Sequence, residues 1–144
     1  MILSRSFCTI VILFSLSLLG SCSTTPSSPL TPNYSANDYL QMAASAQGVS
    51  QQAYLLQATD RLIDQHEIEK AQSILKTTRE QLPPNLRAKK QLITAKLLVA
   101  YHQNDEALST LQAMTEDHSA WTRADQIEWH QIAALANKNL GNFN

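Results

Sequence analysis

The sequence has 144 residues, enough for one domain with a tail, and 44% of them are hydrophobic, which excludes a wholly disordered chain. The formal net charge is −1 without a block of like charges, which excludes the basic footprint of a nucleic-acid-binding protein. Only three glycines supply tight turns, and helix-favouring Ala, Leu, Gln, Glu and Lys dominate after residue 36. We therefore predict an all-α chain.

The first 21 residues have the layout of a signal peptide. Arg5 precedes an almost continuous apolar run over residues 7–19, and small residues follow the run. The run is about 13 residues long, which is shorter than the roughly 20 residues of a membrane-spanning helix. Residues 19–22, Leu-Gly-Ser-Cys, resemble the bacterial lipobox. In lipobox proteins the cysteine sulfur receives a diacylglycerol, the chain is cut before the cysteine, and the new amino terminus is usually acylated.

We therefore expect residues 1–21 to be removed and Cys22 to carry fatty acyl chains, such as palmitate, that anchor the protein to a membrane. A single acyl chain binds a bilayer only marginally, so several chains make the anchor stable. The alternative is an ordinary secretory signal followed by a chance cysteine. In enterobacterial lipoproteins, aspartate directly after the lipidated cysteine favours retention in the inner membrane. This chain has Ser23 at that position, which resembles lipoproteins sorted to the outer membrane. We expect an outer-membrane lipoprotein that faces the periplasm.

Residues 22–36 are predicted to form a linker. Pro26, Pro29 and Pro32 recur every three residues among Ser and Thr, and such a stretch stays extended and solvated because it has little apolar surface to bury. The proline spacing alternatively suits a ligand of a proline-reading domain.

Residues 37–144 are predicted to form a helical domain, because apolar residues recur there with the helical period. Ser50, Asn85 and Thr122 are candidate N-caps, and the consecutive prolines 83 and 84 are expected to stop a helix. Helices are expected at about residues 37–46, 51–65, 67–82, 86–101, 105–114 and 123–140.

An internal repeat organises these helices. Equivalent residues recur 36 positions apart, in the pairs Leu62 and Leu98, His66 and His102, Ala71 and Ala107, and Leu75 and Leu111. A helix-hairpin repeat of about 34 residues is typical of tetratricopeptide (TPR) proteins. We predict a TPR-like α-solenoid of antiparallel helix hairpins, with an irregular helical bundle as the alternative. Residues 140–144 look like the turn of a third hairpin, so we expect that hairpin to be incomplete, as in a truncated product, a fragment or a domain completed by a partner.

The sequence offers no set of residues for catalysis or metal binding. Residues 66–70 begin like a zinc-protease helix, but Lys70 stands where the second histidine is needed. Neither His118 nor His130 has a further metal ligand at a suitable spacing, and a glycine-rich phosphate loop is missing. We interpret the acids of residues 60–69 as a solvated face with local ion pairs. We therefore expect no enzyme, cofactor, metal site, nucleic-acid partner or small-molecule substrate.

Three segments resemble one known family. They are residues 38–43, residues 53–58 and residues 71–75, and they follow the lipobox cysteine, Cys22. In this combination the chain is similar to the N-terminal part of the penicillin-binding protein activator lipoproteins of the LpoA or LppC type. The resemblance spans most of the chain.

That resemblance implies an outer-membrane lipoprotein that stimulates a class A penicillin-binding protein during peptidoglycan synthesis. Family members carry a TPR-like N-terminal domain and a C-terminal domain that resembles periplasmic binding proteins, and activation is attributed mainly to the latter. The chain would then supply the anchor and the spacer. The alternative function is a generic TPR-like adaptor lipoprotein for another envelope assembly or secretion complex.

Overall fold

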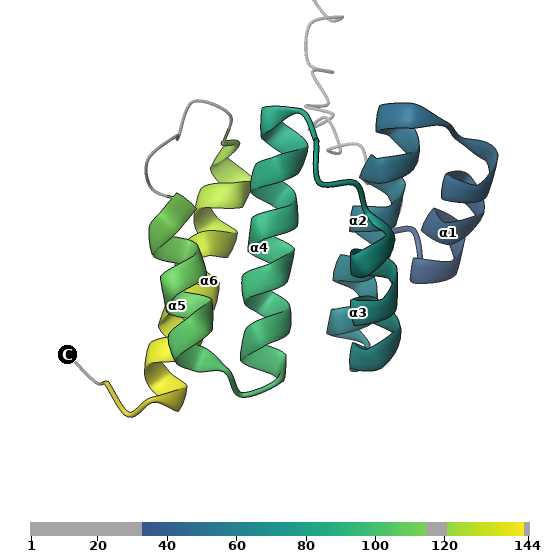
Figure 1. The fold of residues 1–144 in the computed structure, drawn as a ribbon. Coiled ribbons are helices and arrows are strands. Elements are labelled where there is room, and N and C mark those ends of the chain that lie inside the picture. The colour runs from purple at the N-terminus through teal and green to yellow at the C-terminus, as the bar shows by residue number, and fades with distance from the viewer. Residues whose placement is uncertain (1–32, 115–120, 143–144) are drawn as a thin grey trace, which may run out of the picture. The chain divides into compact units, whose positions relative to one another are not determined.

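The computed structural model describes residues 33–114 and 121–142. The chain divides into a unit of Met1–Asn33 and a compact unit of Tyr34–Asn144. The described part of the second unit contains the helices α1 (Ala36–Ser45), α2 (Gly48–Asp64), α3 (Ile68–Thr77), α4 (Pro84–Ala100), α5 (Asn104–Ala113) and α6 (Arg123–Asn139) (Figure 1). The predicted signal peptide and Cys22 lie outside the described residues. None of the described helices is long and apolar enough to cross a membrane.

The helices after α1 form antiparallel hairpins, as predicted. Helices α2 and α3 make the first hairpin, α4 and α5 make the second, and α6 takes the place of the first helix of a third. The helices α2, α4 and α6 have 17 residues each and follow one another across the unit, while the 10-residue helices α3 and α5 pack beside them (Figure 1). Both helices of the second hairpin begin 36 residues after their counterparts. The TPR-like fold class is therefore confirmed.

The turn after each long helix repeats the same backbone conformation. His66 and His102 both have a φ of 61°, and Gly141 has a φ of 76° at the equivalent position. In each turn the amide of the next residue donates a hydrogen bond of 2.9–3.0 Å to a carbonyl five residues earlier. This left-handed helix ending satisfies terminal carbonyls and reverses the chain. The third turn therefore has the geometry of a hairpin turn.

Two apolar clusters form the core, and α4 contributes to both. Ile93 and Leu97 pack into the first cluster with residues of α2 and α3, whereas Leu92 and Ala95 pack into the second with residues of α5 and α6. Trp121 and Trp129 pack against the second cluster. The Trp129 indole N–H also donates a hydrogen bond of 3.0 Å to the carbonyl of Leu111.

Helix α3 ends at Thr77, five residues before the predicted end at Leu82. The hydroxyl groups of Thr77 and Thr78 each donate a 2.7 Å hydrogen bond to a carbonyl of the last turn. The amide of Arg79 donates to the side-chain oxygen of Gln52 at 2.8 Å. These bonds replace the helical ladder, so the chain leaves the helix here although Leu82 remains buried.

The helix starts are partly as predicted. Thr122 forms a capping box with Asp125, which confirms that prediction. The prediction for Ser50 was wrong, because α2 already begins at Gly48, whose φ of 62° only glycine adopts without strain. The prediction that Asn85 caps α4 was wrong, because the helix already begins at Pro84. Proline suits the first position of a helix, since it lacks the amide hydrogen that would have no partner there.

Replacing His66 with glycine should stabilise the fold. The left-handed conformation of His66 is unfavourable by roughly 1–2 kcal/mol for a residue with a Cβ. The His66 side chain is exposed, so its removal loses little packing. We expect His66→Gly to raise the free energy of unfolding by about 0.5–1 kcal/mol in urea denaturation followed by circular dichroism. His66→Ala keeps the Cβ and is the control without a gain. Equal stabilities of the two variants would contradict this account of the turn.

Candidate functional site

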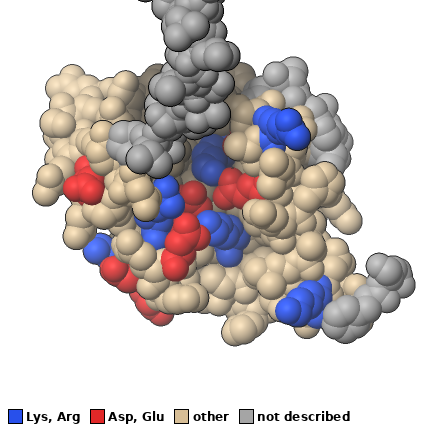
Figure 2. All heavy atoms as spheres, turned by 180° about the vertical axis from the view of Figure 1, so that it is seen from behind, with Lys and Arg blue, Asp and Glu red and all other residues tan. Residues whose placement is uncertain are grey.

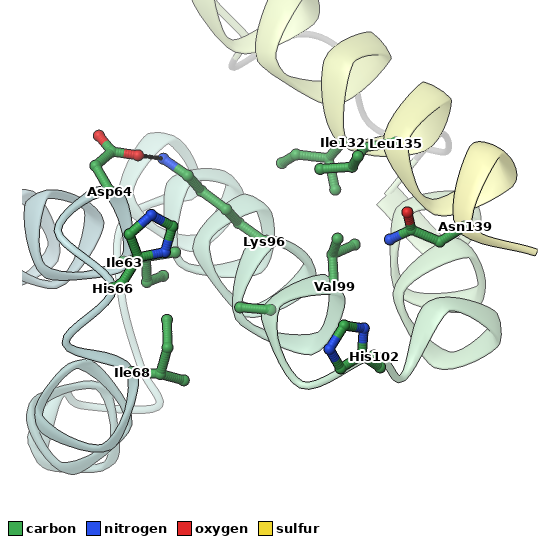
Figure 3. Close-up of a pocket in the computed structure, with 11 residues that line it drawn as sticks. Ile63, Asp64, His66, Ile68, Lys96, Val99, His102, Ile132, Leu135 and Asn139 are labelled. Atoms are coloured by element: carbon green, nitrogen blue, oxygen red, sulfur yellow. Dashed lines mark ion pairs between the residues drawn. The ribbon is translucent and has the colours of Figure 1, made fainter.

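A groove runs across the surface shared by α2, α4 and α6, and we call it the α2–α4–α6 groove. It consists of two hollows with volumes of about 540 Å³ and about 430 Å³. Both hollows are lined by Lys96 of α4 and by Ile132 and Leu135 of α6, so they adjoin. Figure 3 shows the first hollow, where Ile132 and Leu135 point from α6 into the space beside Lys96.

An ion-pair network joins the three helices at the groove. The Lys96 ammonium lies 2.7 Å from Asp60 Oδ1 and 2.7 Å from Asp64 Oδ1, both on α2. The Lys89 ammonium lies 2.6 Å from Glu128 Oε2 of α6 and 3.8 Å from Asp60 Oδ2. The charged side chains gather on this face, as Figure 2 shows. Asp60 and Lys89 therefore link α2 to α4, and Lys89 extends the network to α6.

Lys96 holds its proton more firmly than an ordinary lysine. Burial disfavours the charged form and is the largest influence, but it is outweighed by the hydrogen bonds and charges of Asp60 and Asp64. Together these effects raise the pKa of Lys96 above its ordinary value of 10.5. Lys96 is therefore a fixed cation at neutral pH and suits an electrostatic role rather than proton transfer.

Aliphatic side chains of α6 form one wall of the groove. The fraction exposed is 47% for Leu135 and 50% for Ile127, which is unusual for large aliphatic residues in the described ranges. Ile127 lines the second hollow together with Asp60 from the opposite helix. By position in the repeat, Leu135 corresponds to Lys96 and to Asp60, so this position faces the groove in all three helices.

Sequence reasoning missed this network. It interpreted Asp60 and Asp64 as parts of a solvated face with local pairs, whereas both carboxylates bind Lys96 of the next hairpin. The available signal was the repeat itself, since Asp60 and Lys96 stand 36 residues apart in equivalent positions. Long-range ion pairs across a repeat follow its period rather than the three- or four-residue spacing of a helix.

Two histidines of the hairpin turns also line the groove. His66 and His102, which the sequence placed at helix ends, follow α2 and α4 and line the first hollow with Asn139. Within residues 33–114 and 121–142, no group of three or more His, Cys, Asp or Glu side chains has metal-binding geometry. His118 lies outside the described residues, as does Cys22, the predicted site of lipidation.

Comparison with known proteins identifies the family. The family model described as "LppC putative lipoprotein" matches residues 29–143, which is most of the chain. The chain belongs to the LppC family. Among curated relatives of this LppC chain, the penicillin-binding protein activator LpoA of Vibrio cholerae serotype O1 is 32% identical over 125 residues, which are 82% of the chain and 20% of that protein. The activator LpoA of Aliivibrio fischeri is 26% identical over 136 residues, or 85% of the chain and 22% of that protein.

Two solved structures share the fold of the LppC chain. The amino-terminal domain of Escherichia coli LpoA superposes with a TM-score of 0.67 at 16% identity, covering 73% of this chain and 46% of that one. Haemophilus influenzae LpoA superposes with a TM-score of 0.68 at 22% identity, covering 78% and 20%. The curated relatives are named activators rather than catalysts, and the LppC chain spans about a fifth of their length.

Removing the Lys96 ammonium should weaken the contact between the two hairpins. Lys96→Met leaves Asp60 and Asp64 without their closest cation, and we expect a loss of about 1–2 kcal/mol in the free energy of unfolding. Lys70→Met is the matched control, because it removes only an exposed pair with Glu67 and should cost less than about 0.5 kcal/mol.

The pH dependence of this difference provides a second readout. The pKa of Lys96 is raised in the folded state above its ordinary value of 10.5. Its contribution to the free energy of unfolding is therefore fully present below about pH 10.5 and is lost as the pH rises through the raised pKa. The stability difference between the wild type and Lys96→Met, measured by urea denaturation, should therefore be constant from pH 7 to about pH 10 and shrink at higher pH. A difference that already shrinks near neutral pH would contradict this.

Proposed function

We propose that this chain is the N-terminal part of an outer-membrane lipoprotein that activates a class A penicillin-binding protein in peptidoglycan synthesis. The observation that carries the proposal is the 32% identity to an LpoA activator over 82% of the chain, within a matching lipoprotein family. Since the match covers 20% of that activator, we assign to this chain the roles of anchor and spacer rather than activation. The names of the relatives favour this function over a generic adaptor.

The anchor is proposed to be Cys22. Residues 1–21 would be removed as a signal peptide at the lipobox Leu-Gly-Ser-Cys. Acyl chains on Cys22 would then hold the protein to a membrane, and Ser23 favours the outer membrane. Residues 22–36 would form the linker, ahead of the TPR-like domain of residues 37–144. At about 3.1 Å per residue, an extended linker of this length reaches roughly 4 nm.

The helix that follows the linker starts from a defined point. The Asp38 carboxylate accepts hydrogen bonds from the amide and the hydroxyl of Ser35, at 2.8 Å and 2.7 Å, and these bonds lower the pKa of Asp38. Such a capping box fixes the first turn of a helix. It supports a proposed boundary between the linker and the helical domain near residue 35, because an uncapped helix end would fray.

Substitution of the lipobox cysteine tests the anchor. Cells that express the full gene and grow with radioactive palmitate should label the wild-type protein and not Cys22→Ser, because only the thiol can form the thioether. The labelled protein should pellet with outer membranes. Cys8→Ser is the matched control and should leave labelling unchanged, since Cys8 belongs to the removed segment. Wild-type protein that is free of label and soluble would rule out the anchor.

Recovery of a penicillin-binding protein tests the activator role. The full gene product, cross-linked in intact cells before lysis, should bring down a class A penicillin-binding protein. Deleting residues 34–142 while keeping the lipidated cysteine should remove this recovery in intact cells, because the partner is then out of reach, but not in detergent extracts. If the undeleted protein recovers none, the proposed function is wrong. If the variant without residues 34–142 still recovers the penicillin-binding protein from intact cells, only the spacer role is wrong.

A further inference from the structure

We infer that a hollow between α3 and α4 binds an acidic, extended peptide segment of another protein. This hollow, which we call the α3–α4 hollow, has a volume of about 410 Å³. It shares no lining residue with the α2–α4–α6 groove. The inference does not depend on the proposed anchor or on activation of a penicillin-binding protein, because it rests on the residues of this hollow alone.

Two lysines line the hollow without a carboxylate partner. Within residues 33–114 and 121–142, neither Lys76 nor Lys90 forms an ion pair, although both line the space. On the same helix as Lys90, both Lys89 and Lys96 are paired with carboxylates. Glu80 is the single acid among the described lining residues, so the hollow has a net charge of +1. Charge complementarity therefore favours an anionic ligand.

The Lys90 ammonium is fixed by the end of the preceding helix. It donates hydrogen bonds of 3.3 Å and 3.2 Å to the carbonyls of Thr78 and Arg79, where the chain leaves α3. A neutral group can fill this role, because Trp129, the seventh residue of α6 as Lys90 is of α4, donates its indole N–H to the carbonyl of Leu111 in α5. The repeat therefore needs a donor at this position but not a charge.

Both cations are departures from the repeat. Lys76 is the ninth residue of α3, and the ninth residue of α5 is the neutral Gln112. Trp129 packs its ring against the second cluster, whereas Lys90 has no ring to pack between α3 and α4. One repeat later, neutral residues thus replace both lysines, so the hairpin fold itself does not account for either charge.

The remaining polar lining suits a peptide backbone. The side chains of Gln72, Tyr101 and Gln103 line the hollow, and none of them makes a hydrogen bond to another described residue. An amide side chain both donates and accepts, as the backbone of an extended chain does. A peptide carboxylate can also enter the hollow to reach the half-buried Lys90, whereas the flat surface of a bilayer contacts protruding side chains.

The length of the hollow sets the length of the ligand. It follows α4 from Lys90 to the C-cap residue Tyr101, which is about 16 Å along the helix axis. An extended chain rises about 3.3 Å per residue, so roughly five residues span this distance. The segment would place carboxylates against Lys90 and Lys76 at one end and its backbone against the amides at the other.

Fluorescence anisotropy with a defined peptide tests this inference. The chain from residue 22 onward, with Cys22→Ser to prevent lipidation, keeps all described residues and would be titrated into a fluorescein-labelled hexapeptide of alternating glutamate and alanine. An otherwise identical peptide with glutamine in place of glutamate is the control. We expect the glutamate peptide to bind about tenfold more tightly at low salt, because glutamine keeps the shape but not the charge.

Removal of each lysine charge should weaken binding of the glutamate peptide. We expect Lys76→Gln and Lys90→Gln each to raise the Kd about three- to fivefold, through loss of one ion pair. Lys70→Gln is the matched control, since it removes an exposed lysine of α3 outside the hollow, and should change the Kd less than about twofold. If circular dichroism shows that Lys90→Gln loses helix content, Lys76→Gln decides, because glutamine already occupies its position in α5.

Five results would overturn the inference. The first three are no binding of the glutamate peptide, equal binding of both peptides, and a Kd that Lys76→Gln leaves unchanged. The fourth is an equal loss of binding in Lys70→Gln, which would show a general effect of charge. The fifth is displacement of the labelled peptide by phosphatidylglycerol vesicles as readily as by unlabelled peptide, which would assign the two lysines to a lipid surface.

Discussion

The close approach of two helices within each hairpin is the constraint from which the rest of the structure follows. Ala71 and Ala107 are completely buried at equivalent positions early in the second helices, where a larger side chain would separate the pair. With the helices in contact, the connecting turn has to reverse the chain within a few residues. His66 and His102 make this possible by adopting the left-handed conformation, so the hairpin geometry is maintained at the cost of local strain.

Stacking of hairpins on each other depends on a different balance. The buried clusters that meet at α4 supply most of the free energy, because apolar surface removed from water contributes in proportion to its area. The ion pairs of Lys89 and Lys96 add less, since desolvation offsets much of their attraction. They also join neighbouring hairpins, because Lys89 lies 2.6 Å from Glu128 of α6 and Lys96 lies 2.7 Å from Asp60 of α2.

The sequence predicted the elements better than their contacts. Six helices and the 36-residue offset follow from the apolar period and from pairs such as Ala71 and Ala107, which are visible in one dimension. The end of α3 was misplaced because it depends on Gln52, which accepts a hydrogen bond from an amide 27 residues away. The groove was missed because local pairing rules explained Asp60 without reference to another hairpin.

The groove is also where the repeat stops being regular. Stacked repeats usually place similar residues at equivalent positions, and the core position of Ala71 and Ala107 follows that rule. The position of Asp60 does not, since it changes from acid to base to leucine along α2, α4 and α6. Acid and base neutralise each other across the first two helices, so the leucine faces an ionic surface that it cannot pair with. The groove therefore combines an ion-pair network that reaches Glu128 of α6 with the half-exposed aliphatic side chains of Ile127 and Leu135 on the same helix.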